Sequence, residues 1–282
     1  MKKRTLVSAI VIFAALMFPS CRLGVRFAYN RADWFIMRQL SDFACLTNVQ
    51  RDSIEAEISG FMAWHRKEEL PIYAKNLRDI ATALEKGTLS KEAFENVYSF
   101  FQDTGRRTGE KVKDFGIEFV MSMPPEQIEC SFENFEKRSE ERKKELEMSE
   151  KEFREKRRES LIAQTRKWLG SITEEQIALI DVMIPPLSEE KEVYAASQRK
   201  FQHTKKALMM PDSPQKRDEI VKLIEEPYAL YTEREKNLVE RRREQTREAL
   251  WKLSQTLTER QRANLARQLN NYAKAFEDLS RE

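Results

Sequence analysis

Apolar side chains recur at steps of three and four residues along most of this chain, and this spacing constrains its fold more than any other feature. The clearest stripe consists of Leu265, Leu269, Tyr272, Phe276 and Leu279. Residues at these steps share one face of an α-helix, so each stripe predicts an amphipathic helix with one buried side. Glycine, which supplies the positive-φ turns of sheets and the phosphate-binding loops, accounts for only seven of the 282 residues. The sequence therefore predicts an all-α fold.

Similar stripes predict a series of helices before residue 123. They cover residues 29–43, 54–65, 73–84, 90–104 and 108–122. Pro71 separates the second stripe from the third, and Gly87 is placed to end the third helix as its C′ residue. The first stripe includes Tyr29 and Asp33, one turn apart, with Trp34 next to Asp33. We expect Asp33 to lie on the apolar face of this helix and to orient it by hydrogen bonding in the core, with ligand binding as the alternative.

Residues 136–158 are very highly charged, with eighteen Asp, Glu, Lys or Arg among 23 residues. Mixed signs favour ion pairs on an exposed helix over a disordered tail. Ser149 and Glu152 fit a capping box, so we expect a helix break near 148–149, and a second break at the prolines of 211–214. We expect eight to ten antiparallel helices, some long, in an extended bundle of one or two sub-bundles. The predicted parts are residues 21–148 and 149–282.

The first twenty residues have the pattern of a secretory signal peptide. Residues 2–4 are basic, an apolar run reaches Phe18, and Ser20 is the small residue before the expected cut. The run is shorter than the about 20 apolar residues that a transmembrane helix needs. Cys21 follows directly, which resembles a bacterial lipoprotein signal, in which the cysteine becomes the new N-terminus and is lipidated.

This resemblance implies a lipid-anchored protein. Acyl chains on Cys21, such as palmitate, would attach the chain to a membrane. Arg22, in place of an aspartate, implies the outer membrane, with the protein facing the periplasm. Residues 1–20 hold three of the 50 basic residues and none of the 47 acidic ones, so the mature chain would be neutral. Because a nucleic-acid-binding protein carries a net basic surface, charge and location exclude nucleic acid as a partner.

Two cysteines remain in the mature chain, Cys45 and Cys130. In an oxidising envelope they could pair, and closing so long a loop stabilises a fold by about 4–5 kcal/mol in the chain-entropy model. The alternative is two buried thiols. The cysteine spacing fits no known type of metal site, and we expect neither a metal nor a cofactor.

A short pattern, an apolar residue followed by Thr-x-x-Gln, occurs three times. Its threonine and glutamine residues are Thr47 and Gln50, Thr173 and Gln176, and Thr258 and Gln261. Residues 123–127 are a degenerate fourth copy. We expect each copy to start a helix, because the threonine can cap the third backbone N–H while the glutamine reaches back to the N–H of the threonine. The last two copies lie 85 residues apart and share an upstream Arg-Arg-Glu at 157–159 and 242–244, which indicates a repeated helix–cap–helix unit.

Two segments resemble a known family. One runs from Ala28 to Trp34 and continues to Gln50; the other is Trp64–Ala74, which contains Trp64, His65, Glu69 and Pro71. Together they resemble an uncharacterised family of proteobacterial helical lipoproteins, the domain of unknown function 6279. The resemblance implies an anchored, all-helical envelope protein and brings no assigned activity. The Thr-x-x-Gln helix starts are also similar, more weakly, to small periplasmic stress chaperones of the Spy and CpxP type, which bind unfolded clients.

His65 is the candidate for acid–base or metal chemistry, because Trp64 lies beside it and Glu69 lies one turn on. We favour the alternative, a partly buried imidazole satisfied by a carboxylate or a carbonyl. The reason is that no cluster of ligands flanks His65 or His203, the other histidine. The sequence contains no nucleophile elbow and no phosphate-binding loop, so we assign no catalytic residue.

We therefore expect a non-enzymatic envelope lipoprotein that binds another envelope protein as a structural or assembly factor. A chaperone-like binder of unfolded envelope proteins is the second hypothesis, and it predicts a concave apolar surface. A hydrolase that uses carboxylates is the third, and it requires a deep pocket that holds His65 or several acids.

Overall fold

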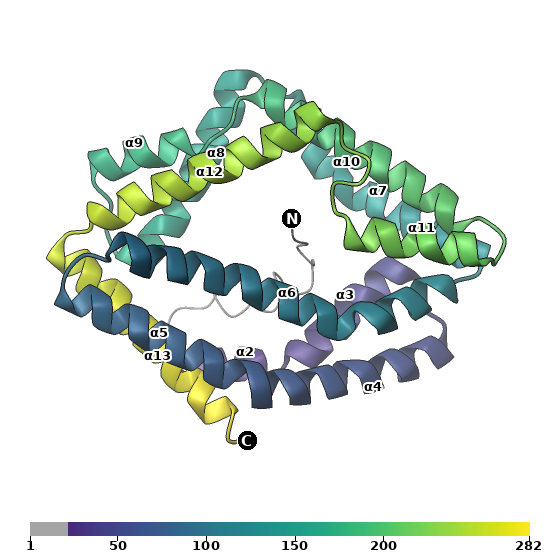
Figure 1. The fold of residues 1–282 in the computed structure, drawn as a ribbon, viewed down its shortest axis with the longest axis horizontal. Coiled ribbons are helices and arrows are strands. Elements are labelled where there is room, and N and C mark those ends of the chain that lie inside the picture. The colour runs from purple at the N-terminus through teal and green to yellow at the C-terminus, as the bar shows by residue number, and fades with distance from the viewer. Residues whose placement is uncertain (1–21) are drawn as a thin grey trace.

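The computed structural model describes residues 22–282, which form α-helices joined by short turns, with one π-helical turn (Figure 1). The predicted signal peptide, residues 1–20, and Cys21 lie outside the described residues. No strand occurs between residues 22 and 282, and the prediction of an all-α, multi-helix fold is confirmed. Within the same range, no helix combines the length and the apolar character that crossing a membrane requires.

The first half of the described chain contains α2 (Arg22–Tyr29), α3 (Ala32–Ala44), α4 (Asn48–Trp64), α5 (Leu70–Lys86), α6 (Lys91–Met121) and α7 (Pro125–Glu147). The second half contains α8 (Glu150–Leu169), α9 (Glu174–Val182), α10 (Leu187–Leu208), α11 (Pro214–Glu225), α12 (Glu233–Gln255) and α13 (Glu259–Leu279). Both expected breaks are confirmed. The first lies between α7 and α8, where Ser149 and Glu152 form the expected capping box, and the second lies between α10 and α11.

The helix around Pro71 differs from the prediction. The expected separation at this proline is wrong, because α4 passes through a π-helical turn, η1 (His65–Glu69), directly into α5. In this turn the N–H of Leu70 bonds to the carbonyl of His65, five residues earlier. Proline has no N–H to offer and its ring crowds the carbonyl four residues before it, so the wider π turn lets the helix continue past Pro71.

Two other predicted boundaries are also wrong. The stripes at 90–104 and 108–122 belong to one helix, α6, which continues through Gly105 and Gly109 because an interior glycine destabilises a helix by only about 1 kcal/mol. The predicted first helix is instead divided at Asn30 and Arg31, so Tyr29 ends α2 while Asp33 lies in the first turn of α3.

The helices form a closed frame in which segments far apart in the chain lie side by side (Figure 1). The C-terminal helix α13 packs along α5 and α2. Tyr272 and Phe276 of α13 therefore share a core with Val25, Ile54 and Leu70 from the N-terminal helices. Residues on both sides of the predicted boundary at 148–149 contribute to this core, and the division into two sub-bundles stays a prediction.

Candidate functional site

Two joints of similar design hold helices together at opposite ends of the frame (Figure 1). The disulfide joint, where the α3–α4 turn meets the α6–α7 turn, consists of Cys45, Thr47, Gln50, Gln127 and Cys130. The glutamine joint, where the α8–α9 turn meets the α12–α13 turn, consists of Thr173, Gln176, Thr258 and Gln261. At the first joint α3 packs on α7 and α4 on α6; at the second α8 packs on α13 and α9 on α12. At each joint, therefore, the first helix of one helix–turn–helix unit packs on the second helix of the other unit, and the reverse.

Gln176 and Gln261 face each other at the centre of the glutamine joint, and both are 0 % exposed. Nε2 of Gln176 donates to Oε1 of Gln261 at 2.9 Å, and Nε2 of Gln261 donates to Oε1 of Gln176 at 2.8 Å. The second N–H of each amide donates to a backbone carbonyl, that of Thr256 at 3.1 Å and that of Ser171 at 3.0 Å respectively. Each Oε1 also accepts the backbone N–H of its own N-cap threonine, at 3.0 and 2.9 Å. Each amide thus uses both donors and accepts two hydrogen bonds, which is its full capacity.

The predicted helix caps complete this network. Thr173 and Thr258 accept the backbone N–H of Gln176 and Gln261, at 3.3 and 3.2 Å, so both helix starts have full capping boxes. A buried polar network in which every member is satisfied fixes one arrangement of its helices. The glutamine joint therefore determines how α9 and α13 begin relative to each other.

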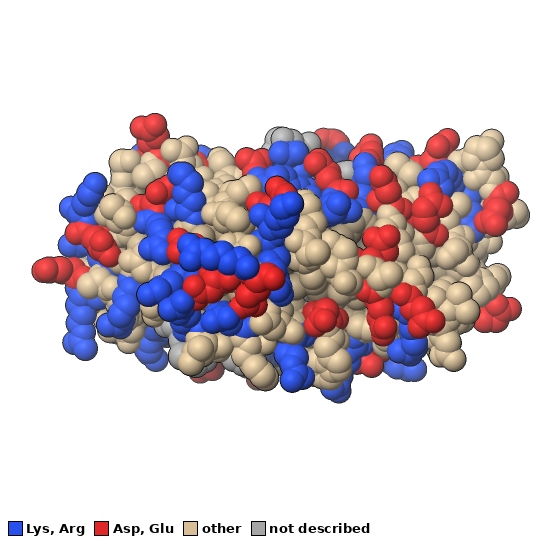
Figure 2. Space-filling model, turned by 90° about the horizontal axis from the view of Figure 1, so that it is seen from below, with Lys and Arg blue, Asp and Glu red and all other residues tan. Residues whose placement is uncertain are grey.

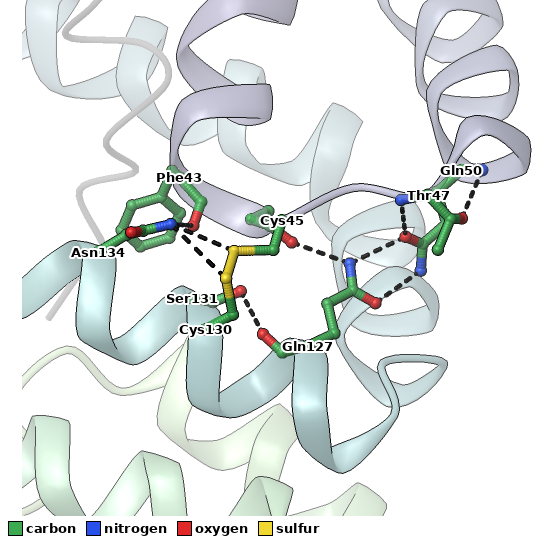
Figure 3. Close-up of a disulfide and its surroundings, with 9 residues drawn as sticks. Phe43, Cys45, Thr47, Gln50, Gln127, Cys130, Ser131 and Asn134 are labelled. Carbon is green, nitrogen blue, oxygen red and sulfur yellow. Dashed lines mark hydrogen bonds between the residues drawn. A yellow bond between two sulfur atoms is a disulfide. The ribbon is translucent and has the colours of Figure 1, made fainter.

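The disulfide joint repeats this pairing with one departure (Figure 3). Nε2 of Gln50 donates to Oε1 of Gln127 at 2.9 Å, and Nε2 of Gln127 donates to Oε1 of Gln50 at 2.8 Å and to the carbonyl of Ala44 at 2.9 Å. Thr47 and Gln50 form a capping box at the start of α4. The corresponding cap of α7 is Pro124, which offers neither a hydroxyl nor an N–H, so Gln127 makes no capping box there.

Cys45 and Cys130 form a disulfide beside this glutamine pair (Figure 3). Their Cα atoms are 6.2 Å apart, within the usual range for such bonds, although the residues are 85 apart in the chain. Cys45 follows α3 in the left-handed conformation, with φ of 48°, and this turns the chain toward α4. Nδ2 of Asn134 donates to the carbonyl of Phe43 at 3.4 Å, which further ties α7 to the end of α3.

Sequence reasoning identified the helix starts but missed that their glutamines meet in pairs. A capping box is visible within four residues, whereas the partner glutamine lies 77 or 85 residues away. Two signals in the sequence pointed to the pairing: the Arg-Arg-Glu repeat that accompanies the last two copies, and the degenerate copy at 123–127, which supplies Gln127.

His65 lies in the π turn and is buried, with 2 % exposure. Its ring contacts those of Tyr29, Phe61 and Tyr73, and its Nδ1 is joined to the hydroxyl of Tyr29 by a hydrogen bond of 2.9 Å. The expected partner, a carboxylate or a carbonyl, is therefore wrong. Burial lowers the pKa of His65 to about 4, against the opposing charge of Glu69, and burial raises the pKa of Tyr29 to about 12. Both side chains are neutral at pH 7, and their hydrogen bond ties α2 to the π turn.

Glu69 faces α6 and does not pair with His65. Its two carboxylate oxygens accept hydrogen bonds from Nε and Nη2 of Arg107, at 2.7 and 2.8 Å, and its side chain is 2 % exposed. This hydrogen bond holds the pKa of Arg107 above its usual range. Trp64 is half-buried at the same level, with Nζ of Lys111 5.7 Å from its ring centre. The cluster therefore links the long helix over residues 48–86 to α6, with Tyr29 as the partner of His65 and Arg107 as the partner of Glu69.

Asp33 and Trp34 lie outside this core. Because the chain turns at Asn30 and Arg31, Asp33 is exposed at the start of α3, and its carboxylate accepts the backbone N–H of Trp34 at 2.7 Å. The ring of Trp34 is exposed as well. The expectation that Asp33 orients the first helix from an apolar face is therefore wrong.

Outside the joints and the core, the surface is rich in charge. Basic and acidic side chains are interspersed on the face in Figure 2. Many charged side chains of the protein pair with one another, as Arg78 does with Glu277 and Arg158 with Asp181. Between residues 22 and 282, no three His, Cys, Asp or Glu side chains gather closely enough to hold a metal ion. An open hollow beside Val182 and Ala249, between α9 and α12, is partly apolar.

The fold and its joints define an all-helical protein whose buried polar groups connect helices to one another. The model of a family of unknown function, DUF6279, matches residues 42–236, and the chain belongs to this family. The family assignment that the sequence suggested is confirmed. Comparison with curated proteins and with solved structures finds no match.

Proposed function

We propose that this protein is a lipoprotein, anchored in the outer membrane through Cys21, that faces the periplasm and acts as a non-enzymatic scaffold for another envelope protein. The observation that carries the proposal is the disulfide between Cys45 and Cys130 at the disulfide joint. Disulfides persist in oxidising compartments such as the periplasm, which supports the proposed location. The bond also fixes the helices at one end of the frame. A scaffold needs such fixed helices to present a constant surface to its partner.

The burial of the reactive groups supports a scaffold over a hydrolase. His65 lies among aromatic rings and bonds to Tyr29, while both oxygens of Glu69 are held by Arg107. Neither group is placed to meet a substrate from solution. Their contacts instead join α2, the π turn and α6, which gives them a structural role.

The anchor is tested by metabolic labelling with radioactive palmitate in a bacterial host that processes lipoproteins. We expect the wild-type protein to be labelled and to fractionate with the outer membrane. The Cys21→Ala variant should carry no label, and the Cys45→Ser variant, which keeps the lipidation site, should be labelled as the wild type is. Labelling of the Cys21→Ala variant would contradict the proposed anchor.

The scaffold is tested by crosslinking in native envelopes followed by purification. We expect one partner to be recovered with the wild-type chain and to be lost with Gln176→Glu, because this change disrupts the glutamine joint. Gln164→Glu is the matched control, since Gln164 is exposed on α8. Recovery of no envelope protein, or equal recovery with both variants, would contradict the proposal.

A chaperone-like binder is the second candidate, because several large apolar side chains are exposed. They include Val49, Phe101, Val182 and Met209. Such a protein would suppress the aggregation of a chemically denatured client at near-equimolar ratio, and would capture many unrelated envelope proteins in the crosslinking experiment. The scaffold proposal predicts neither result.

A further inference from the structure

Helices α2 and α3 expose large apolar side chains at positions where a water-facing helix would carry polar ones. Leu23 is 71 % exposed, Phe27 is 66 % exposed and Trp34 is 57 % exposed. Leu23 and Phe27 are one turn apart, so they share a face of α2. The opposite face of the same helix holds Val25 and Tyr29, which are buried in the core.

This face is held in place by the rest of the protein. Arg22 and Arg26 on α2 pair with Asp278 and Glu282 at the C-terminus, and Val25 packs in the core with α13. These contacts fix α2 in orientation, so its apolar outer face is a built feature of the fold.

Two arginines accompany the exposed rings. The guanidinium of Arg31 lies 5.4 Å from the centre of the Phe27 ring, and that of Arg38 lies 5.4 Å from the centre of the Trp34 ring. Neither arginine takes part in the ion pairs that hold α2 to the C-terminus. Because Arg22 and Arg26 pair with the C-terminus, Arg31 and Arg38 are the cations that lie next to the exposed rings.

We propose that Leu23, Phe27, Arg31, Trp34 and Arg38 form a membrane-contact face that lies in the headgroup region of an anionic phospholipid bilayer. This inference rests on the proposed anchor, because α2 begins at the residue after Cys21 and acyl chains there would hold the face against the bilayer. Leucine, phenylalanine and tryptophan enter the boundary of the acyl chains, and arginines attract anionic headgroups. Acyl chains and the membrane-contact face together would fix the orientation of the frame relative to the membrane.

Trp34 provides the test, because the other three tryptophans are half-buried while its ring is exposed. The full-length, processed protein is reconstituted into vesicles of phosphatidylethanolamine and phosphatidylglycerol whose acyl chains carry bromine, a quencher of tryptophan fluorescence. We expect the bromine to quench tryptophan fluorescence in the wild type, and we expect this quenching to disappear in Trp34→Phe. The quenching should weaken when phosphatidylcholine with the same acyl chains replaces both lipids.

The apolar contacts are tested by Leu23→Asp and Phe27→Asp, each of which should abolish the quenching of Trp34. Val49→Asp is the matched control, since Val49 is an apolar side chain at the start of α4 with 80 % exposure, and it should leave the quenching unchanged. Circular dichroism checks that all variants are folded. Absence of Trp34 quenching in vesicle-bound wild-type protein, or an equal loss with Val49→Asp, would overturn the proposal.

The mass of the N-terminal peptide separates this result from the proposed anchor. An acylated Cys21 with an unquenched Trp34 would refute the membrane-contact face alone. An unmodified Cys21 would refute the anchor, whatever the fluorescence shows.

Discussion

The side-chain amides of Gln176 and Gln261 satisfy each other across the glutamine joint, although the two residues are 85 apart in the chain and neither is exposed. Because each amide uses its full hydrogen-bonding capacity, a change in one residue leaves buried polar atoms of the other unpaired. The pair therefore joins two helix starts that capping boxes alone would leave independent.

Replacing Gln176 with glutamate removes two donated hydrogen bonds and places a carboxylate in a fully buried site. We expect the free energy of unfolding to fall by at least about 3 kcal/mol, since a buried charge without a partner is strongly destabilising. Chemical denaturation measures the change. Gln164→Glu, on the exposed side of α8, should change stability by less than about 0.5 kcal/mol, and equal effects of the two variants would refute the role of the joint.

Double-mutant analysis measures the coupling between the two glutamines. Gln176→Leu and Gln261→Leu should each be destabilising, and the double variant should lose less stability than the sum of the two, by about 1–3 kcal/mol. Additive effects would show that the two amides act independently of each other.

The disulfide closes a loop of 85 residues, so its removal should destabilise the protein by about 4–5 kcal/mol through the entropy of the unfolded chain. Cys45→Ser with Cys130→Ser, or reduction of the wild type, should lower the melting temperature. Reduction of the double variant is the control and should have no further effect. A melting temperature that is the same in oxidised and reduced wild type would contradict a stabilising bond.

The buried His65 predicts a loss of stability in mild acid. Its pKa is about 4 in the folded protein, below the ordinary value of 6.5, so the unfolded chain binds the proton more readily as the pH falls from 6.5 toward 4. The stability that its neutral state contributes is present above pH 6.5 and should fall by about 2–3 kcal/mol between pH 7.5 and 4.5. His65→Gln should show a smaller fall than the wild type, and an equal fall in both proteins would contradict this role of His65.

The ion pair of Glu69 and Arg107 should matter far more for stability than the exposed carboxylate of Asp33. Glu69→Gln removes the buried charge that pairs with the partly exposed Arg107, and we expect a loss of about 1–3 kcal/mol. Asp33→Ala removes one exposed hydrogen bond at a helix start, and we expect a loss of less than about 1 kcal/mol. Thermal denaturation of the two variants compares them directly, and a larger loss for Asp33→Ala would reverse the assignment.

Local features of this fold follow from the sequence because they depend on residues within one or two helical turns. The stripe from Leu265 to Leu279 predicts α13, and Ser149 with Glu152 predicts the start of α8. The caps at Thr47, Thr173 and Thr258 are of the same kind, since each involves residues three apart.

The partners of the buried polar groups do not follow from the sequence. Glu69 is bound by Arg107 and Gln50 by Gln127, and these choices depend on how distant helices pack. The place of Asp33 depends on a break at Asn30, where no proline or glycine marks the end of a helix. At Pro71 the helix continues although a proline usually ends one. The π turn before it accommodates a residue that cannot donate a backbone hydrogen bond.

We propose a frame that is locked by a disulfide and anchored through Cys21. Mass spectrometry of the protein purified from native envelopes without reduction tests both features in one measurement. We predict an N-terminal peptide that begins at an acylated Cys21, together with a cross-linked pair of peptides that contain Cys45 and Cys130. An unmodified Cys21 accompanied by free thiols at Cys45 and Cys130 would contradict the account.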